Sequence, residues 1–479
     1  MTKDYEPIAG LKFELLDDEA LERVEDGAYR ILESVGMKLT EEESKVILTA
    51  AGATIEGDRV FLPPELVKDA IDSAPTEMVL YDQNGYGALV LTGYNSFFGA
   101  SVDGPALLDP EEGTYRDCRE EDISWVVGLV DELDNLSFLM PAGFAADRDS
   151  KMAEVVSAKQ CMLNTDKPLV VITETPEDLR TIHGMAEVKT PHSFSSKPFF
   201  VNYAEPISPL VNPDASAQKV IYCAEEEIPL LYSPFLAMGA TAPQNAATAV
   251  AQACAESLFG LVLHQQVNPG APFVFGGMPS MMDMQTANFS YGAPDLQVMS
   301  SAIAEMGHHF GLPVFGTAGT GDSKRFDGQA MMEALSSVYM ASLSGANLIH
   351  DVGLFGSAKV LIPDMIVAID EMIALIKHTL RGMEVGDKVD ISLLKELGPG
   401  GEFVSHKHTL ENFKSSWYPR FLDRSPYSNQ DVEEFATFRE RINDYVLGFL
   451  DGGSKKSSVD SELRDELEEI ESELATTKK

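Results

Sequence analysis

Acidic and aromatic side chains follow a series of short β-rich runs along the chain, at the positions where the runs end. These positions include Asp103, Glu174, Asn202, Tyr203, Glu205, Phe235, His350 and Asp351, and the following loops contain Phe289, Tyr291, Phe326 and Phe355. No Lys or Arg stands at these run ends. Carboxylates with aromatic faces and no competing cation are typical of a pocket for a quaternary ammonium group. The pattern therefore predicts a cation site, although any packed core would also contribute aromatic residues.

Eight such runs alternate with eight longer helical patterns. The runs are 96–100, 137–142, 169–173, 199–203, 230–235, 273–275, 314–317 and 347–350. The helical patterns begin near Glu120, Asp149, Pro176, Asp214, Asn245, Asp295, Asp327 and Pro363, and many open with residue types that cap or start a helix. This alternation predicts an α/β fold with a (β/α)₈ barrel over residues 93–383, with an open doubly wound sheet as the alternative. In a barrel, residues just after the strands converge on one mouth.

The segments outside the predicted barrel differ in character. Residues 1–92 combine helical patterns with a short hairpin, which predicts an N-terminal α/β extension, mostly helical. Residues 384–450 contain a Gly-Pro-Gly-Gly turn and aromatic helices, which predict a C-terminal helical extension packed on the barrel. Residues 451–479 open with a Gly/Ser-rich linker and become strongly acidic. We expect a flexible acidic tail there, with a docked helix as the alternative.

Composition excludes several classes of partner. The 479 residues include 36 Lys and Arg against 76 Asp and Glu, a formal net charge of −40. That charge argues against a nucleic-acid binder and against an anionic membrane surface. No uninterrupted apolar run reaches about 18 residues, so no membrane span is expected, and no signal peptide is evident. The four Cys residues form no CxxC pair, which favours reduced thiols in a cytoplasmic protein.

Two local patterns resemble cofactor motifs but lack a decisive residue. Gly316–Ser323 has the glycine spacing of a phosphate loop, yet Asp322 stands where a Lys would bind phosphate. His350–Gly353 matches half of the DxHxxG signature of corrinoid-binding proteins, but Leu348 replaces the first Asp. No pair of histidines has the spacing of a helical zinc site. We therefore expect no metal site and no permanently bound cofactor.

Five segments together resemble the trimethylamine methyltransferase family. They are Ala28–Gly36, Val60–Val67, Asp103–Asp117 with Arg116, Asp322–Gln329 and Ser344–His350. The resemblance implies a (β/α)₈ barrel that moves a methyl group from a methylamine to Co(I) of a separate corrinoid protein. Trimethylamine enzymes of this family carry pyrrolysine, which we would expect near the Gly319–Asp327 loop, where this chain has Arg325 and Phe326. The chain therefore resembles the branch without pyrrolysine, which acts on quaternary amines.

This resemblance, combined with the strand ends, leads to specific expectations for the ammonium group. The favoured substrate is glycine betaine, with proline betaine, carnitine and γ-butyrobetaine as alternatives. Asp103 and Glu205 are expected to face the ammonium. Tyr203 and Phe355 are expected to wall its cage, and Phe235 is placed in the same substrate site.

The other end of the substrate and its partners are also implied. His350 and Asn202 are expected to bind the substrate carboxylate. No catalytic acid or base is expected, because a quaternary nitrogen leaves as a neutral amine. The partner would be a corrinoid protein whose cobalt cycles between Co(I) and methyl-Co(III), and a homo-oligomer is expected. A non-catalytic osmolyte-binding protein and a barrel enzyme of other chemistry remain the alternatives.

Overall fold

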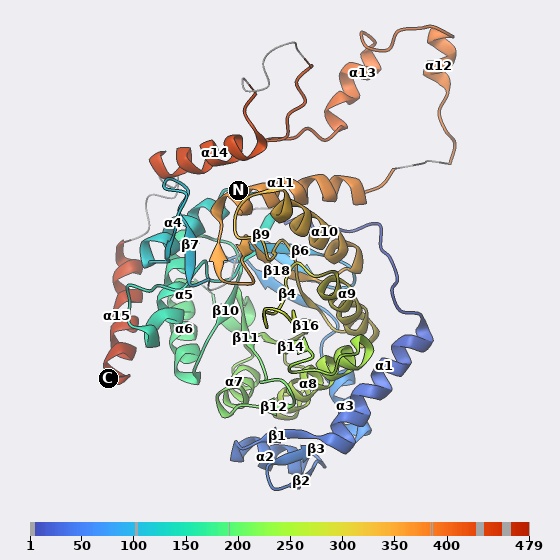
Figure 1. The fold of residues 1–479 in the computed structure, drawn as a ribbon. Helices are drawn as coiled ribbons and strands as arrows, with labels where there is room; N and C mark the ends of the chain where they lie inside the picture. Colours follow the sequence, from blue (N-terminus) through green and yellow to red (C-terminus); the bar gives the residue numbers. More distant parts are fainter. Residues whose placement is uncertain are drawn as a thin grey trace.

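A closed barrel of eight parallel strands forms the centre of the computed structural model, which describes residues 5–100, 104–190, 192–383, 385, 387–427, 435–452 and 461–478 (Figure 1). The strands are β6 (Phe97–Ala100), β9 (Leu136–Leu139), β10 (Leu169–Ile172), β11 (Phe200–Ala204), β13 (Leu230–Tyr232), β15 (Phe273–Phe275), β17 (Phe315–Thr317) and β18 (Leu348–Val352). They pair in chain order, and β18 returns to pair with β6. The Phe275 N–H donates to the Pro313 carbonyl (2.8 Å), which joins β15 to β17. The predicted (β/α)₈ fold is confirmed.

One long helix follows each barrel strand. These helices are α4 (Glu120–Asp131), α5 (Ala153–Asn164), α6 (Pro176–Lys189), α7 (Asp214–Glu225), α8 (Ala246–Val267), α9 (Pro294–His309), α10 (Gly328–Ser344) and α11 (Pro363–Leu380). Most of their starts lie at or next to the predicted residues, but α5 begins at Ala153, after a 3₁₀ turn (Ser150–Met152) that Asp149 caps. The Asn245 side chain accepts from the Thr248 N–H (3.0 Å), and the Asp327 side chain accepts from Gln329 and Ala330 N–H groups. Side-chain caps thus set where several of the barrel helices begin.

A hairpin closes the N-terminal end of the barrel. It consists of β4 (Met78–Tyr81) and β5 (Ala88–Leu91), and its side chains Leu80 and Leu89 belong to the same buried cluster as Phe138 and Phe315 from inside the barrel. The Tyr81 N–H donates to the carbonyl of Pro198, just before β11 (2.9 Å). The interior is therefore a packed apolar core at this end, which leaves polar chemistry to the opposite end.

The N-terminal extension covers α8. It consists of α1 (Asp18–Arg30), η1 (Ile31–Val35), β1 (Met37–Leu39), α2 (Glu42–Ala50), β2 (Thr54–Glu56), β3 (Arg59–Phe61) and α3 (Pro64–Ser73). Helices α1, α2 and α3 all pack against α8. Among the described residues, α8 is the one helix long and apolar enough to cross a membrane, and 83% of its apolar window is buried inside the protein. Its apolar character serves the core of this fold.

The C-terminal tail corrects one expectation. Residues 461–478 are not a flexible acidic tail, because α15 (Ser461–Thr477) packs against α5 and α6 and buries Leu467 and Leu474. The Glu471 carboxylate lies 2.5 Å from both the Lys159 ammonium and the Arg148 guanidinium. The expected docked alternative is the one observed, and a buried ion pair together with two leucines holds it.

The segment before the tail packs only in part as expected. Helix α14 (Phe438–Gly452) packs against α11 and buries Ile442 and Val446. Residues 387–418, which include α12 (Ser392–Leu397) and α13 (Lys407–Asn412), instead extend away from the body, and none of them is buried (Figure 1). The prediction that this whole stretch packs on the barrel is wrong for residues 387–418.

One buried histidine makes the stability of the fold depend on pH. His264 of α8 is fully buried, and burial lowers its pKa to about 3. The unfolded chain takes up a proton near the ordinary pKa of about 6.5, whereas the folded chain does not. The stabilisation is therefore complete above about pH 6.5 and is lost as the pH falls toward 3. Between about pH 7 and 5, this residue should lower the free energy of unfolding by about 2 kcal/mol.

The test compares His264→Gln with His378→Gln, which changes an exposed histidine of α11. Urea unfolding at about pH 7 and 5 measures the difference in unfolding free energy. That difference should shrink by about 2 kcal/mol in H264Q alone. An unchanged difference in H264Q would show that His264 does not cause the acid sensitivity.

Candidate functional site

Two small sheets border the C-terminal mouth of the barrel. They consist of β7 (Ala106–Leu108), β8 (Tyr115–Asp117), β19 (Leu354–Phe355) and β20 (Val360–Leu361) in the first, and β14 (Phe235–Met238) with β16 (Met278–Met281) in the second. The first joins the loops after β6 and β18, and the second joins those after β13 and β15. Active sites in this fold lie at this end, so the mouth is the candidate site.

Tyr203 and Glu205 form an acidic pair at the end of β11. The Tyr203 side chain continues the inward-facing row of the barrel, and its hydroxyl donates to Glu205 Oε2 (2.7 Å), with the Ser233 carbonyl 3.2 Å away. Burial and the nearby Glu205 charge raise the pKa of Tyr203 well above its usual value. The hydroxyl therefore stays protonated, and the negative charge remains on the exposed Glu205 carboxylate.

His350 and Asp351 form a second polar group at the ends of β17 and β18. The His350 ring stacks on Phe315 with the ring centres 4.2 Å apart. Its Nδ1 lies 2.9 Å from the Gly316 carbonyl, and its Nε2 lies 3.2 Å from Asp351 Oδ1. Asp351 Oδ2 also accepts from the Thr317 hydroxyl (2.5 Å). Both ring nitrogens therefore lie against acceptors within the protein.

The backbone at Asp351 is in an uncommon conformation. Asp351 is 1% exposed, and its φ angle is 78°, in the left-handed region that most side chains avoid. The pairing of β18 with β6 shifts register between Ile349 and Val352. Such irregularities re-aim side chains and concentrate at functional sites. Here the irregularity places the Asp351 carboxylate beside the His350 ring.

Three further aromatic rings line the side of the mouth nearest Tyr203. Phe235 packs on Phe289 with the ring centres 4.1 Å apart, and Phe289 meets Tyr291 at 5.0 Å, edge to face. Tyr291 lies close enough to Tyr203 to influence its acidity. Phe235 remains 36% exposed, so part of its ring is accessible. Carboxylates beside accessible aromatic faces suit an organic cation.

Asp322 holds the loop that carries Tyr291. Its carboxylate accepts from the N–H groups of Tyr291 (3.0 Å) and Gly292 (3.0 Å) and from the hydroxyls of Ser290 and Ser357. These donors come from two separate loops of the mouth. Asp322, which is unsuited to a phosphate loop, therefore has a structural role: it fixes the loop that carries Tyr291.

Comparison with known proteins now decides the family. The family model described as trimethylamine methyltransferase (MTTB) matches residues 6–473. This chain belongs to the MTTB family of methyltransferases.

Individual relatives span nearly the whole MTTB-family chain. A trimethylamine methyltransferase of Desulfitobacterium hafniense is 26% identical over 470 residues, which cover 96% of this chain and 95% of the relative. A glycine betaine methyltransferase from another strain of that species is 25% identical over 439 residues, covering 89% and 90%. The solved monomethylamine methyltransferase of Methanosarcina barkeri covers 93% of this chain and 96% of its own, at 12% identity and a TM-score of 0.48.

The structure brings some of the expected MTTB site residues together and separates others. Tyr203, Glu205, Phe235 and His350 all lie at the mouth, and their binding roles stay predictions. Asp103 falls outside the described residues. Within the described part of the chain, no three His, Cys, Asp or Glu side chains are grouped as a metal site would require.

Two expected site residues do not face the mouth. Asn202 is fully buried on the outer face of β11, where its Oδ1 accepts from the Thr173 hydroxyl (2.9 Å). Successive strand residues point to opposite faces, so Tyr203 faces inward and Asn202 faces the helices. Phe355 is fully buried in the main core beneath the β19–β20 pair. Neither is positioned to touch a substrate in the mouth.

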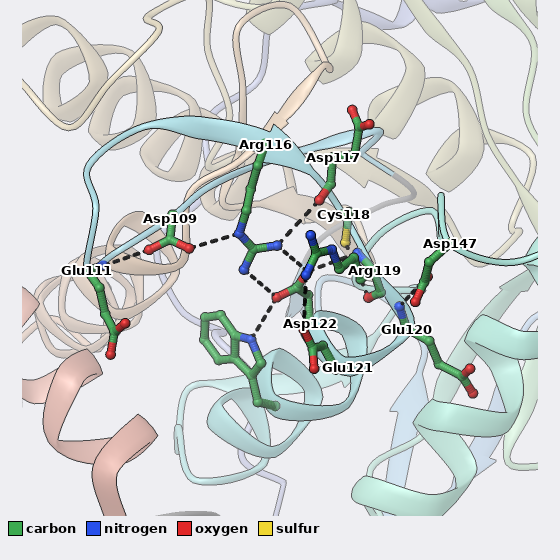
Figure 2. Close-up of polar contacts among 11 residues, drawn as sticks. Asp109, Glu111, Arg116, Asp117, Cys118, Arg119, Glu120, Glu121, Asp122 and Asp147 are labelled. Carbon is green, nitrogen blue, oxygen red and sulfur yellow. Dashed lines mark hydrogen bonds and ion pairs between the residues drawn. The ribbon is translucent and has the colours of Figure 1, made fainter.

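Arg116 organises the sheet on one border of the mouth (Figure 2). Its guanidinium donates to Asp109 (2.8 Å) and, through both terminal nitrogens, to Asp122 (2.5 and 2.7 Å). Asp122 is 1% exposed and also accepts from the Trp125 indole (3.1 Å). Burial opposes its charge, but the hydrogen bonds from Arg116 and from the Arg119 N–H outweigh burial and hold the pKa of Asp122 below its usual range. The β7–β8 hairpin is thereby fixed to the start of α4.

Three residues of the mouth were not assigned to the substrate site from sequence. Phe315 stacks under His350, Tyr291 lies near Tyr203, and Asp322 holds the Tyr291 loop. Tyr291 already stood out as an aromatic residue in a loop after a strand. The alternation of β17 could have placed Phe315 inside the barrel, because Thr317 and Phe315 share a face. Nothing in the sequence around Asp322 could have predicted its contacts to the other loops.

Proposed function

We propose that the protein transfers a methyl group from a quaternary amine, with glycine betaine favoured, to Co(I) of a separate corrinoid protein. The observation that carries the proposal is the pairing of unlike polar groups at one mouth. Glu205 and the rings of Tyr203 and Phe235 suit the ammonium, while a ring N–H of His350, which faces Asp351 in this structure, is a donor that suits a carboxylate. A betaine has both charges in one small molecule.

The chemistry requires positioning rather than acid–base groups. Co(I) supplies the electron pair that forms the bond to the methyl carbon. The carbon–nitrogen bond breaks, and its electron pair stays on nitrogen. The product dimethylglycine therefore leaves with an uncharged amine nitrogen, while the cobalt becomes methyl-Co(III). The charge of the ammonium disappears in this step, so the role of the mouth is to orient the cation and exclude water. Binding that is too strong in the ground state would slow the step.

The deciding experiment is anaerobic and optical. The protein is mixed with a corrinoid protein reduced to Co(I), an amine is added, and the absorbance of methyl-Co(III) is followed. Conversion with glycine betaine and none with trimethylamine supports the proposal in full. Conversion with carnitine, proline betaine or γ-butyrobetaine alone keeps the reaction and replaces the substrate. If no quaternary amine reacts with a competent partner but isothermal titration shows glycine betaine binding, the protein is an osmolyte-binding protein instead.

Glu205→Gln should weaken the substrate complex within this assay. Removing the carboxylate charge that faces the ammonium is expected to raise KM for glycine betaine about tenfold, with a smaller change in kcat. Glu225→Gln, an exposed change at the far end of α7, serves as the matched control. Equal KM values for the two variants would remove Glu205 from the site.

A further inference from the structure

Residues 387–418 form a projecting segment, called here the arm. It extends outward beyond α11 and α14 (Figure 1). None of its residues is buried, and eight of the 26 large apolar side chains exposed in the described part of the chain lie on it. They are Val389, Ile391, Leu394, Phe403, Val404, Leu410, Phe413 and Tyr418. Exposed apolar side chains gathered on one projecting segment mark an interaction site.

The C-terminal base of the arm is anchored to the body. The Glu371 carboxylate of α11, which is 5% exposed, accepts from the N–H groups of Arg420 (2.9 Å) and Phe421 (3.1 Å). The Arg420 guanidinium lies 4.3 Å from the ring centre of Tyr445 on α14. The N-terminal side of the arm follows the end of α11. The arm is therefore presented from a fixed base.

The arm cannot maintain its own shape by internal packing. Its helices α12 and α13 have six residues each, and isolated helices shorter than about 12 residues are marginal in water. No side chain of the arm is buried against another. An external surface must supply the apolar burial that orders the segment.

Charge favours a second copy of this chain as that surface. The arm has four Lys and five Asp or Glu residues, a net charge of −1 out of the chain's −40. The acidic surfaces outside the arm repel each other between two copies, whereas the nearly neutral arm can approach a second copy with little repulsion. A surface that needs cover whenever the chain is folded also requires a partner present in equal amount. A second copy meets both conditions.

The body offers a receiving groove between α1 and α8. The groove has a volume of about 580 Å³. Most of its lining is apolar, and includes Leu16, Ala20, Val24, Ile31, Ala247 and Ala251. Its two arginines, Arg23 and Arg30, extend into solvent at the rim, with more than 60% of each side chain exposed. Each already pairs at the surface, Arg23 with Glu19 and Arg30 with Asp26. Such exposed pairs can be exchanged for acidic side chains of an arm such as Glu396 and Glu411.

We propose that the arm of one copy binds in the α1–α8 groove of a second copy. The pairing joins two different surfaces, so it is a head-to-tail interface. It covers the arm's apolar side chains and fills the groove, and it is independent of the reaction proposed above.

Sedimentation of the full chain tests the proposal. At micromolar concentration the protein should sediment as an assembly larger than its 52.2 kDa chain. Leu394→Asp with Leu410→Asp on the arm should give a monomer, and so should Ala247→Glu, which adds an acid at the start of α8 where a helix tolerates one. Val46→Asp, on an exposed α2 position, should leave the assembly unchanged. Circular dichroism and thermal unfolding check that every variant is folded.

Mixing the two monomeric variants tests the pairing itself. The arm variant retains an intact groove and the groove variant retains an intact arm, so together they should form a one-to-one complex. A wild-type monomer, or an arm variant that still assembles, would overturn the proposal. A groove variant that assembles like the wild type, or a mixture that stays monomeric, would overturn the assignment of the arm to this groove.

Discussion

Replacing Asp351 by Asn is expected to lower kcat/KM for glycine betaine by about 10²-fold without unfolding the protein. The carboxylate is the negative partner of the His350 Nε2 at 3.2 Å and accepts from the Thr317 hydroxyl. A charge-assisted contact of this kind contributes about 1.5–3 kcal/mol. Without it, the His350 ring loses the charged partner that holds its Nε2 in place. Asn tolerates a φ of 78° as well as Asp does, so the backbone should keep its course.

Two comparisons separate this role from a structural one. Tetramethylammonium has no carboxylate, so its turnover by D351N should fall far less than that of glycine betaine. Thr317→Val removes one hydrogen bond from Asp351 but keeps its charge and should cost about tenfold or less. Equal losses with both amines would show that His350 and Asp351 act on something other than the substrate carboxylate.

Replacing Arg116 by Met is expected to destabilise the fold by about 3–5 kcal/mol. The change leaves Asp122, which is 1% exposed, as a buried carboxylate without its cation. Urea unfolding should show a lower midpoint with an unchanged slope. Arg119→Met is the matched control, because the Arg119 side chain is exposed and pairs at the surface with Glu121 (3.5 Å).

A double variant sharpens the Arg116 test. Asp122→Asn in the R116M background removes the stranded charge while keeping an acceptor for the Arg119 N–H. It should recover a large part of the lost stability. If R116M unfolds like the wild type, the network at the mouth contributes little, and the β7–β8 hairpin is held by its apolar contacts.

The barrel was predictable because its signals are local. The strands are short buried runs, and the helix starts carry their own caps, such as Asn245 before α8 and Asp327 before α10. Closure needed only the count of eight, which the structure confirms. The family resemblance agreed with this pattern over nearly the whole chain.

The site was less predictable because strand ends specify an edge and not a face. Adjacent residues Asn202 and Tyr203 were both placed at the mouth, yet the alternation of a strand allows only one of them to face inward. The prediction that Phe355 faces the substrate failed for another reason. The loop after β18 forms a second small sheet over the core, and nothing within the loop shows which side of that sheet is covered.

The C-terminal tail shows the limit set by long-range contacts. Its acidic composition is typical of a solvated segment, but Glu471 meets Lys159, which is 312 positions away in the chain. The partner lysine is buried on α5, and only the folded arrangement brings the two together. Composition alone cannot predict a charge pair of this kind.

The hairpin that closes the N-terminal end of the barrel imposes an order of events. With that end filled by Leu80 and Leu89, the described chain leaves the mouth as the route for the amine. In the proposed reaction the cobalt must approach through the same mouth. On that proposal, the amine should bind before the corrinoid protein, and its product should depart after the corrinoid protein leaves. Excess unmethylated corrinoid protein should then trap the empty enzyme, and added glycine betaine should relieve that inhibition competitively.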